Sequence, residues 1–104
     1  MSKRMKAYRS DLKLLGECTP STRKAVFKNC DKDLINAISE AVYSVLDRRV
    51  PIQPKQLARL KKDQPILRQI ATKSKTVAQK RRLLSSQRGG NIISFLINAI
   101  KQLF

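Results

Sequence analysis

The stretch that decides the fold is Asp31–Asp47, with the sequence DKDLINAISEAVYSVLD. Asp31 and Asp33 complement the positive end of a helix dipole at its start. The apolar residues recur at helical spacing: Leu34, Ile35, Ile38, Ala41, Val42, Val45 and Leu46. The opposite side is polar: Asn36, Ser39, Glu40, Tyr43 and Asp47. We therefore expect a core helix whose polar face is solvated or faces a partner.

Two shorter helices are expected before this core helix. Met5, Tyr8, Leu12 and Leu15 share one stripe of a first helix, which ends near Gly16. A second helix runs from Pro20 to Asn29, with Thr19 as its N-cap and Pro20 at the first helical position, where the missing N–H costs nothing.

After the core helix, two prolines, Pro51 and Pro54, favour an extended connection. Short helices are expected over 55–62 and 66–70, and a last bundle helix begins at Thr72 or Ser74 and reaches about residue 87. Sustained alternation of apolar and polar residues, the strand pattern, is lacking. The sequence predicts an all-α fold, a compact bundle of about five to six short helices with no sheet.

The net charge of +16 is concentrated in one part of the chain. Residues 48–88 hold thirteen basic side chains and one acidic one, whereas residues 1–47 hold nine and six. Solvated surfaces normally mix both signs, so this imbalance favours a polyanionic partner, most simply nucleic acid. The charge pattern alone does not distinguish DNA from RNA.

Phosphate contact is expected from basic residues of this segment. Zinc-finger, basic-zipper, RNA-recognition and GXXG patterns are lacking, so binding should be electrostatic and independent of base sequence. Lys55, Arg59 and Lys62 form a basic ridge at i, i+4 and i+7. The predicted nucleic-acid-binding residues are Arg48, Arg49, Lys55, Arg59, Lys62, Lys73, Lys75, Lys80, Arg81, Arg82 and Arg88.

The composition offers few residues for catalysis or metal binding. The chain has no histidine, and its two cysteines are Cys18 and Cys30, which excludes a Cys/His zinc site and a Cys–His catalytic pair. We expect two free thiols, no cofactor, no metal and no catalytic residue. The charged N-terminus does not resemble a signal peptide, which favours an intracellular protein that is not secreted.

A Gly-Gly pair separates the basic segment from an apolar end, which divides the chain into a basic bundle (1–88), a hinge (89–90) and an amphipathic helix (91–104). This helix would be about 21 Å long, too short to span a bilayer of roughly 30 Å. It could fold onto the bundle, mediate self-association or lie on a membrane surface. The predicted membrane or oligomer contacts are Ile92, Ile93, Phe95, Leu96, Ile97, Ile100, Leu103 and Phe104.

From about Leu12 onward the chain resembles small basic virion core proteins of adenovirus-related viruses and Polinton/Maverick (adintovirus-type) elements. The resemblance rests on the core helix with Val50-Pro51, on Lys80–Leu84 (KRRLL) and on the Gly pair followed by an apolar end. It implies condensation of double-stranded DNA, as by adenovirus core protein X (mu), and location in the host nucleus and the virion. It also implies a protease cleavage motif, with cleavage after Gly90: Gln87, Arg88, Gly89, Gly90 and Asn91.

The expected function is therefore sequence-nonspecific DNA binding or condensation by a virion-core protein. Unlike the Arg-rich core peptides, this chain has enough apolar residues for a folded core, which leaves room for a wrapping or bridging role. One alternative is a membrane-active or capsid-docking protein that acts through residues 91–104. Another is an interaction module of a larger assembly, in which the apolar arc stays exposed and drives oligomer formation.

Overall fold

The predicted core helix is α4, Lys32–Leu46, in a computed structural model that describes residues 3–47 and 49–100. The Asp31 carboxylate caps its first turn, because Oδ1 accepts a hydrogen bond from the Leu34 backbone N–H at 2.9 Å. The face that carries Ile35, Ile38 and Val42 is fully buried. The core helix is confirmed, and the structure adds a capping hydrogen bond to the predicted dipole role of Asp31.

The remaining chain is also helical, and the described residues contain no strand. The all-α class is therefore confirmed, although the described residues form eight helices rather than five to six. One reason is that Tyr8, with φ −103° and ψ 19°, interrupts the N-terminal stripe and divides the expected first helix. The helices are α1 (Lys3–Ala7), α2 (Arg9–Glu17), α3 (Pro20–Asn29), α4, α5 (Pro54–Lys62), α6 (Gln64–Ala71), α7 (Val77–Ser85) and α8 (Gln87–Ile100).

Most predicted helix starts agree with the structure. Thr19 caps α3 by accepting the Thr22 N–H, and Pro54 occupies the first turn of α5. The expected start of the last bundle helix at Thr72 or Ser74 was wrong. Thr76 is the cap instead, because it forms a capping box with Gln79 in which each side chain bonds the backbone N–H of the other residue.

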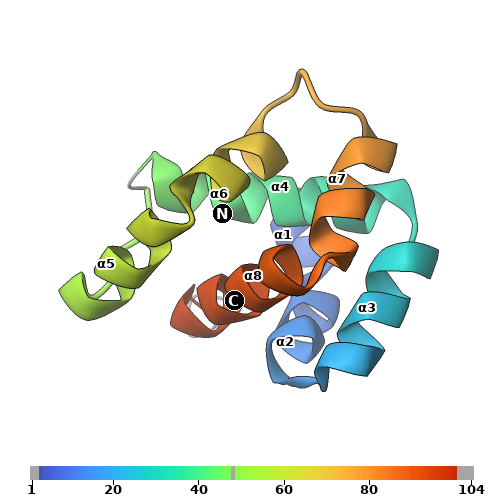
Figure 1. Cartoon of the computed structure of the whole chain (residues 1–104), viewed down its shortest axis with the longest axis horizontal. Coiled ribbons are helices and arrows are strands. Elements are labelled where there is room, and N and C mark those ends of the chain that lie inside the picture. Colours follow the sequence, from blue (N-terminus) through green and yellow to red (C-terminus); the bar gives the residue numbers. More distant parts are fainter. Residues whose placement is uncertain (1–2, 48, 101–104) are drawn as a thin grey trace.

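Two long helices, α4 and α8, cross the middle of the molecule, with α5 and α6 on the left of Figure 1 and α3 and α7 on the right. Helix α4 packs against α1, α6 and α7, whereas α8 packs against α2, α3, α5 and α7. Side chains of both long helices belong to one hydrophobic core, which includes Phe27, Leu67 and Leu84 from the shorter helices. The result is a bundle measuring 33 × 29 × 26 Å.

The apolar end of the chain is part of this bundle. Helix α8 begins at Gln87, so Gly89 and Gly90 lie in its first turn and are buried. The predicted hinge at 89–90 and the separate helix from residue 91 therefore differ from the structure, in which Ser86 separates α7 from α8. A Cβ at Gly89 would overlap the carbonyl oxygen of Leu83, so this glycine permits close packing of α7 and α8.

Helices α2 and α8 approach each other closely at Gly16. A Cβ at this position would lie 2.7 Å from Asn98 Oδ1 and 3.1 Å from Ile97 Cγ2. The Gly16 carbonyl lies in the last turn of α2 and accepts hydrogen bonds from Asn98 Nδ2 at 2.7 Å and from Ser94 Oγ at 3.2 Å. Side chains of α8 therefore satisfy a carbonyl that α2 leaves without a helical partner.

Replacement of Gly89 by alanine tests the packing role of the glycine pair. We expect Gly89→Ala to lower the free energy of unfolding by about 1–3 kcal/mol, because the added methyl group meets backbone that cannot rotate away. Urea unfolding measures this change, with Gln87→Ala, an exposed position in the same turn, as the control. A Gly89→Ala protein as stable as the control variant would contradict the packing role.

Candidate nucleic-acid interface

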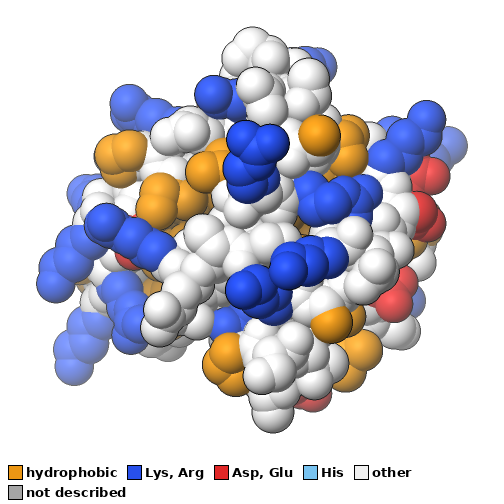
Figure 2. All heavy atoms as spheres, turned by 45° about the vertical axis from the view of Figure 1, so that its right-hand side comes forward, with side chains coloured by type: hydrophobic (Ala, Val, Ile, Leu, Met, Phe, Trp, Pro, Cys, Tyr) orange, Lys and Arg blue, Asp and Glu red, His pale blue; other side chains and the backbone are white. Residues whose placement is uncertain are grey.

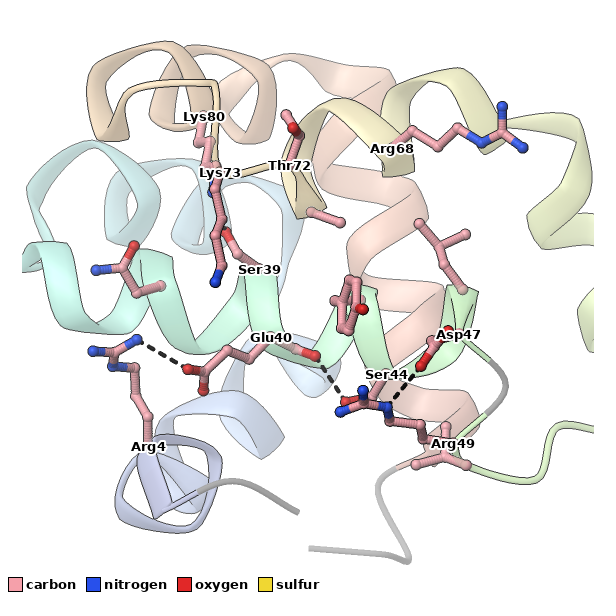
Figure 3. Close-up of a pocket in the computed structure, with 15 residues that line it drawn as sticks. Arg4, Ser39, Glu40, Ser44, Asp47, Arg49, Arg68, Thr72, Lys73 and Lys80 are labelled. Carbon is pink, nitrogen blue, oxygen red and sulfur yellow. Dashed lines mark hydrogen bonds and ion pairs between the residues drawn. The ribbon is translucent and has the colours of Figure 1, made fainter.

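An open groove of about 1130 Å³ lies along α4. Its floor is the polar face predicted from the sequence: Asn36, Ser39, Glu40, Tyr43 and Asp47. Arg4 of α1, Arg49, the end of α6 and the α6–α7 turn form its sides (Figure 3). The polar face of the core helix is thus the base of a groove and not only a solvated surface.

Positive charge predominates in this groove. Among the described residues, five basic side chains line it, with two carboxylates. Both carboxylates are in ion pairs: Arg4 Nη1 lies 3.0 Å from Glu40 Oε1, and Arg49 Nε lies 2.7 Å from Asp47 Oδ2. Arg68, Lys73 and Lys80 form no ion pair with any described residue. The groove therefore keeps uncompensated positive charge for an anionic partner.

Lys73 and Tyr43 are the residues of the groove best placed to contact such a partner. In Figure 3, the Lys73 side chain extends from the α6–α7 turn toward Ser39, whereas the guanidinium of Arg68 points away from α4. Tyr43 is 47% exposed, and Arg49 Cζ lies 5.2 Å from the centroid of its ring. An exposed ring in the same groove as the unpaired Lys73 offers both stacking and phosphate contact.

Lys80 has a structural position that the sequence did not reveal. It is 5% exposed, and its Nζ donates a hydrogen bond to Ser39 Oγ at 3.1 Å. Burial lowers the pKa of this amine from its ordinary value of 10.5. The prediction that Lys80 is a freely displayed phosphate contact therefore needs correction, because its amine is held against α4.

Arg81 also serves the fold. Its Nη1 donates to the carbonyl oxygens of Phe27 at 2.8 Å and Cys30 at 2.7 Å, which lie at the C-terminal end of α3. The guanidinium thus satisfies carbonyls that a helix end leaves without partners. Arg81 Nη1 also lies 3.6 Å from Cys30 Sγ. Burial nevertheless raises the pKa of the Cys30 thiol, which favours the protonated form.

The predicted ridge on α5 is exposed along its whole length. Lys55, Arg59 and Lys62 are all accessible, and Lys61 adds a further exposed cation. The Cζ of Arg59 lies 4.4 Å from the centroid of the Phe95 ring on α8, so its guanidinium also packs against the bundle. The ridge is therefore a surface that a phosphate backbone could reach.

The other predicted binding residues differ in their surroundings. Arg49 and Arg82 are exposed, and Lys75 is half-buried. Arg88 Nε lies 2.6 Å from Asp63 Oδ1, so the one acidic residue of the 48–88 segment already has a cationic partner. Arg48 lies outside the described residues. Figure 2 shows Lys and Arg side chains across one whole face, with few acidic side chains, most of them at its right edge.

The structure adds residues that the sequence did not single out. Arg68 belongs to the basic segment but has no place in the predicted ridge, and Arg4 reaches the groove from α1. Arg4 and Glu40 are 36 positions apart, so no local pattern predicts their contact. For Arg68, the charge excess of the segment was the only signal.

The predicted cleavage motif is folded in this structure. Gln87–Asn91 forms the start of α8, and both glycines are buried. A protease needs an extended, accessible segment, so cleavage of the described conformation would require local unfolding. Cleavage itself stays a prediction.

The predicted membrane or oligomer contacts are mostly in the core. Phe95 is partly buried, and Leu103 and Phe104 lie outside the described residues. The described part of the chain contains no helix long and apolar enough to cross a membrane. A membrane or self-association role would require α8 to leave the bundle. The buried members of the set are Ile92, Ile93, Leu96, Ile97 and Ile100.

Metal binding has no visible basis in residues 3–47 and 49–100, where no three Cys, Asp or Glu side chains are grouped to hold an ion. Cys18 and Cys30 are free and half-buried.

No protein-family model, curated protein or solved structure matches this chain. The groove and the basic surface must therefore be interpreted from their own geometry.

Arg81 and Arg82 form a matched pair that separates a structural cation from a displayed one. We expect Arg81→Ala to lower the free energy of unfolding by about 1.5–3 kcal/mol through loss of its bonds to the α3 carbonyls. Arg82→Ala should change it by less than about 0.5 kcal/mol, because the side chain is exposed. Urea unfolding measures both. Equal destabilisation by the two variants would contradict this division.

The buried amine of Lys80 should make stability depend on pH. As pH rises through the lowered pKa, the folded protein loses this proton before the unfolded chain does, so Lys80 contributes a gain in stability up to about pH 10.5. We expect Lys80→Met to be at least as stable as wild type near pH 7 and to lack this gain. Urea unfolding of Lys80→Met and wild type between about pH 7 and 10.5 gives the difference in unfolding free energy that tests this expectation.

Lys73→Met is the control for this comparison, because Lys73 lies in the same groove but is exposed. The difference in unfolding free energy between Lys73→Met and wild type should not change over the same pH range. A Lys80→Met difference that is also flat would show that the Lys80 amine is not desolvated.

Proposed function

We propose that this chain is a non-enzymatic protein that binds double-stranded DNA through electrostatic contacts without base specificity, as the virion-core proteins it resembles do. The proposal includes condensation or wrapping of DNA in the host nucleus and the virion. It rests on the displayed charge of a folded bundle rather than on any catalytic arrangement.

One observation carries this proposal. The segment 48–88 holds thirteen basic residues and one acidic residue, Asp63, whose carboxylate is already bonded to Arg88. Even without Lys80 and Arg81, which serve the fold, exposed cations remain on α5, α6, the α6–α7 turn and α7. These charges repel one another in the folded state, and a polyanion relieves that repulsion.

The spacing of the cations supports binding without base specificity. They are distributed over several short helices and a turn. Lysine and arginine contacts to phosphate position a protein on a duplex but read no sequence. Several such contacts made together would neutralise a stretch of backbone.

Salt titration tests the proposal. Fluorescence anisotropy of a labelled duplex should give an affinity that falls linearly with salt on a log–log scale, with a slope of about −0.9 for each phosphate neutralised. A random-sequence duplex and any other duplex of equal length should bind alike. No binding at low salt, or an affinity that is almost independent of salt, would exclude the electrostatic mechanism.

A matched pair of double variants locates the interface. Arg68→Gln with Lys73→Gln should reduce the magnitude of the salt slope by about 2, roughly 1 for each lost phosphate contact. Arg9→Gln with Lys13→Gln removes the same charge from exposed positions of α2, outside the basic segment, and should leave the slope nearly unchanged. Equal effects of the two variants would mean that only net charge matters.

A further inference from the structure

A second hollow lies apart from the groove, where the N-terminal ends of α3 and α8 meet the end of α7. Its volume is about 260 Å³. No carboxylate is among the described residues that line it. The polar and charged residues that matter for its chemistry are Arg23, Lys24, Ser85, Ser86, Gln87 and Asn91.

The guanidinium of Arg23 is buried here without a counter-charge. Arg23 is 6% exposed, and its Nη2 donates to the neutral Asn91 Oδ1 at 2.7 Å. It forms no ion pair with any described residue. Burial of a charge without an opposite charge raises the free energy of the folded protein. An anion bound in this hollow would lower that free energy.

The neighbouring groups add donors and positive potential to the same place. Helix α3 begins at Pro20, which has no N–H, and α8 begins at Gln87. Thr19 Oγ1 and Ser86 Oγ already accept one first-turn N–H each, from Thr22 and Gly89, so the available backbone donors are those of Ser21, Gln87 and Arg88. Ser85 is also among the lining residues, and its buried Oγ has no hydrogen-bond partner among the described residues. Lys24 is exposed and contributes a second cation.

Gly90 also lines this hollow. A Cβ at Gly90 would lie 3.1 Å from the Leu84 carbonyl oxygen, which is a tight contact, and 3.4 Å from Arg23 Nε, which is an ordinary one. Gly90 therefore permits the close approach of α8 to α7 beside the Arg23 guanidinium.

We propose that this hollow binds a phosphate oxyanion, with Arg23 as its buried counter-charge, Lys24 at its entrance and the N-terminal turns of α3 and α8 as further donors. Donors that converge from several directions suit a tetrahedral phosphate, and helix N-termini together with arginine are common components of phosphate sites. Resting on the proposed function, the phosphate is one of the DNA backbone, and the site anchors the duplex on the α3–α8 side of the bundle.

Inorganic phosphate is the first probe. In an amide NMR titration at constant ionic strength, balanced with sodium chloride, the signals of Ser21, Gln87 and Asn91 should shift and saturate. Lys24→Gln should weaken binding about tenfold, the change expected from losing one charge-assisted hydrogen bond. Lys28→Gln removes the same charge one turn further along α3, from an exposed position outside the hollow, and should leave the affinity unchanged.

Arg23→Gln should abolish the shifts, provided that its thermal unfolding shows a folded protein. Should that variant unfold, the comparison of Lys24→Gln with Lys28→Gln still decides. Absence of saturable shifts at the three amides, or equal weakening by Lys24→Gln and Lys28→Gln, would overturn the proposal.

A short DNA duplex is the second probe, and it separates this site from the general function. Shifts at the same three amides, weakened by Lys24→Gln, would support a backbone phosphate as the ligand. A duplex that binds without moving these amides would overturn the anchoring role and leave the general DNA-binding function intact. Inorganic phosphate that binds while the duplex does not would overturn DNA binding and assign the site to a free phosphate compound.

Discussion

The docking of α8 against α2 is the contact on which the rest of the structure depends. Gly16 allows the two helices to approach, and Asn98 and Ser94 donate to its carbonyl oxygen across the interface. Because Gly16 and Asn98 are 82 positions apart, this contact joins the two ends of the described chain. Helix α8 also packs against α3, α5 and α7, so its docking completes the hydrophobic core.

This arrangement divides the basic residues into two groups. Arg23, Lys80 and Arg81 are turned inward or against helix ends, where they bond Asn91, Ser39 and the α3 carbonyls. The cations of the α5 ridge, Arg68 of α6, Lys73 of the α6–α7 turn and Arg82 of α7 are exposed. The basic residues therefore include structural and displayed members, and only the displayed ones are accessible to an anionic partner.

Local signals predicted much of the fold, because they act over a few residues. The apolar period of α4, the Thr19-Pro20 start of α3 and the short helix over 55–62 lie where the sequence predicts them. The role of α8 could not be predicted in this way. A wide apolar arc looks the same whether it faces a core, a membrane or another copy, and only tertiary contact decides.

The candidate site also depends partly on local signals and partly on contacts between distant segments. The polar face of α4 was visible in the sequence, but the groove above it depends on Arg4 and the α6–α7 turn, which come from distant segments. The positions of Lys80 and Arg81 were missed because neighbouring residues on a helix point in different directions, and charge alone does not tell which direction faces the bundle. Arg23 and Asn91, 68 positions apart, gave no local signal at all.

The central claim is that α8 belongs to the rigid core and that the basic surface is displayed on that core. Native-state hydrogen exchange tests it most directly, because it gives an opening free energy for each amide. The account predicts that the amides of Ile93, Leu96 and Ile97 in α8 exchange only through global unfolding, like those of Ile38 and Val42 in α4. Exchange of the α8 amides at a much lower opening free energy than those of α4 would contradict it and indicate a detachable end.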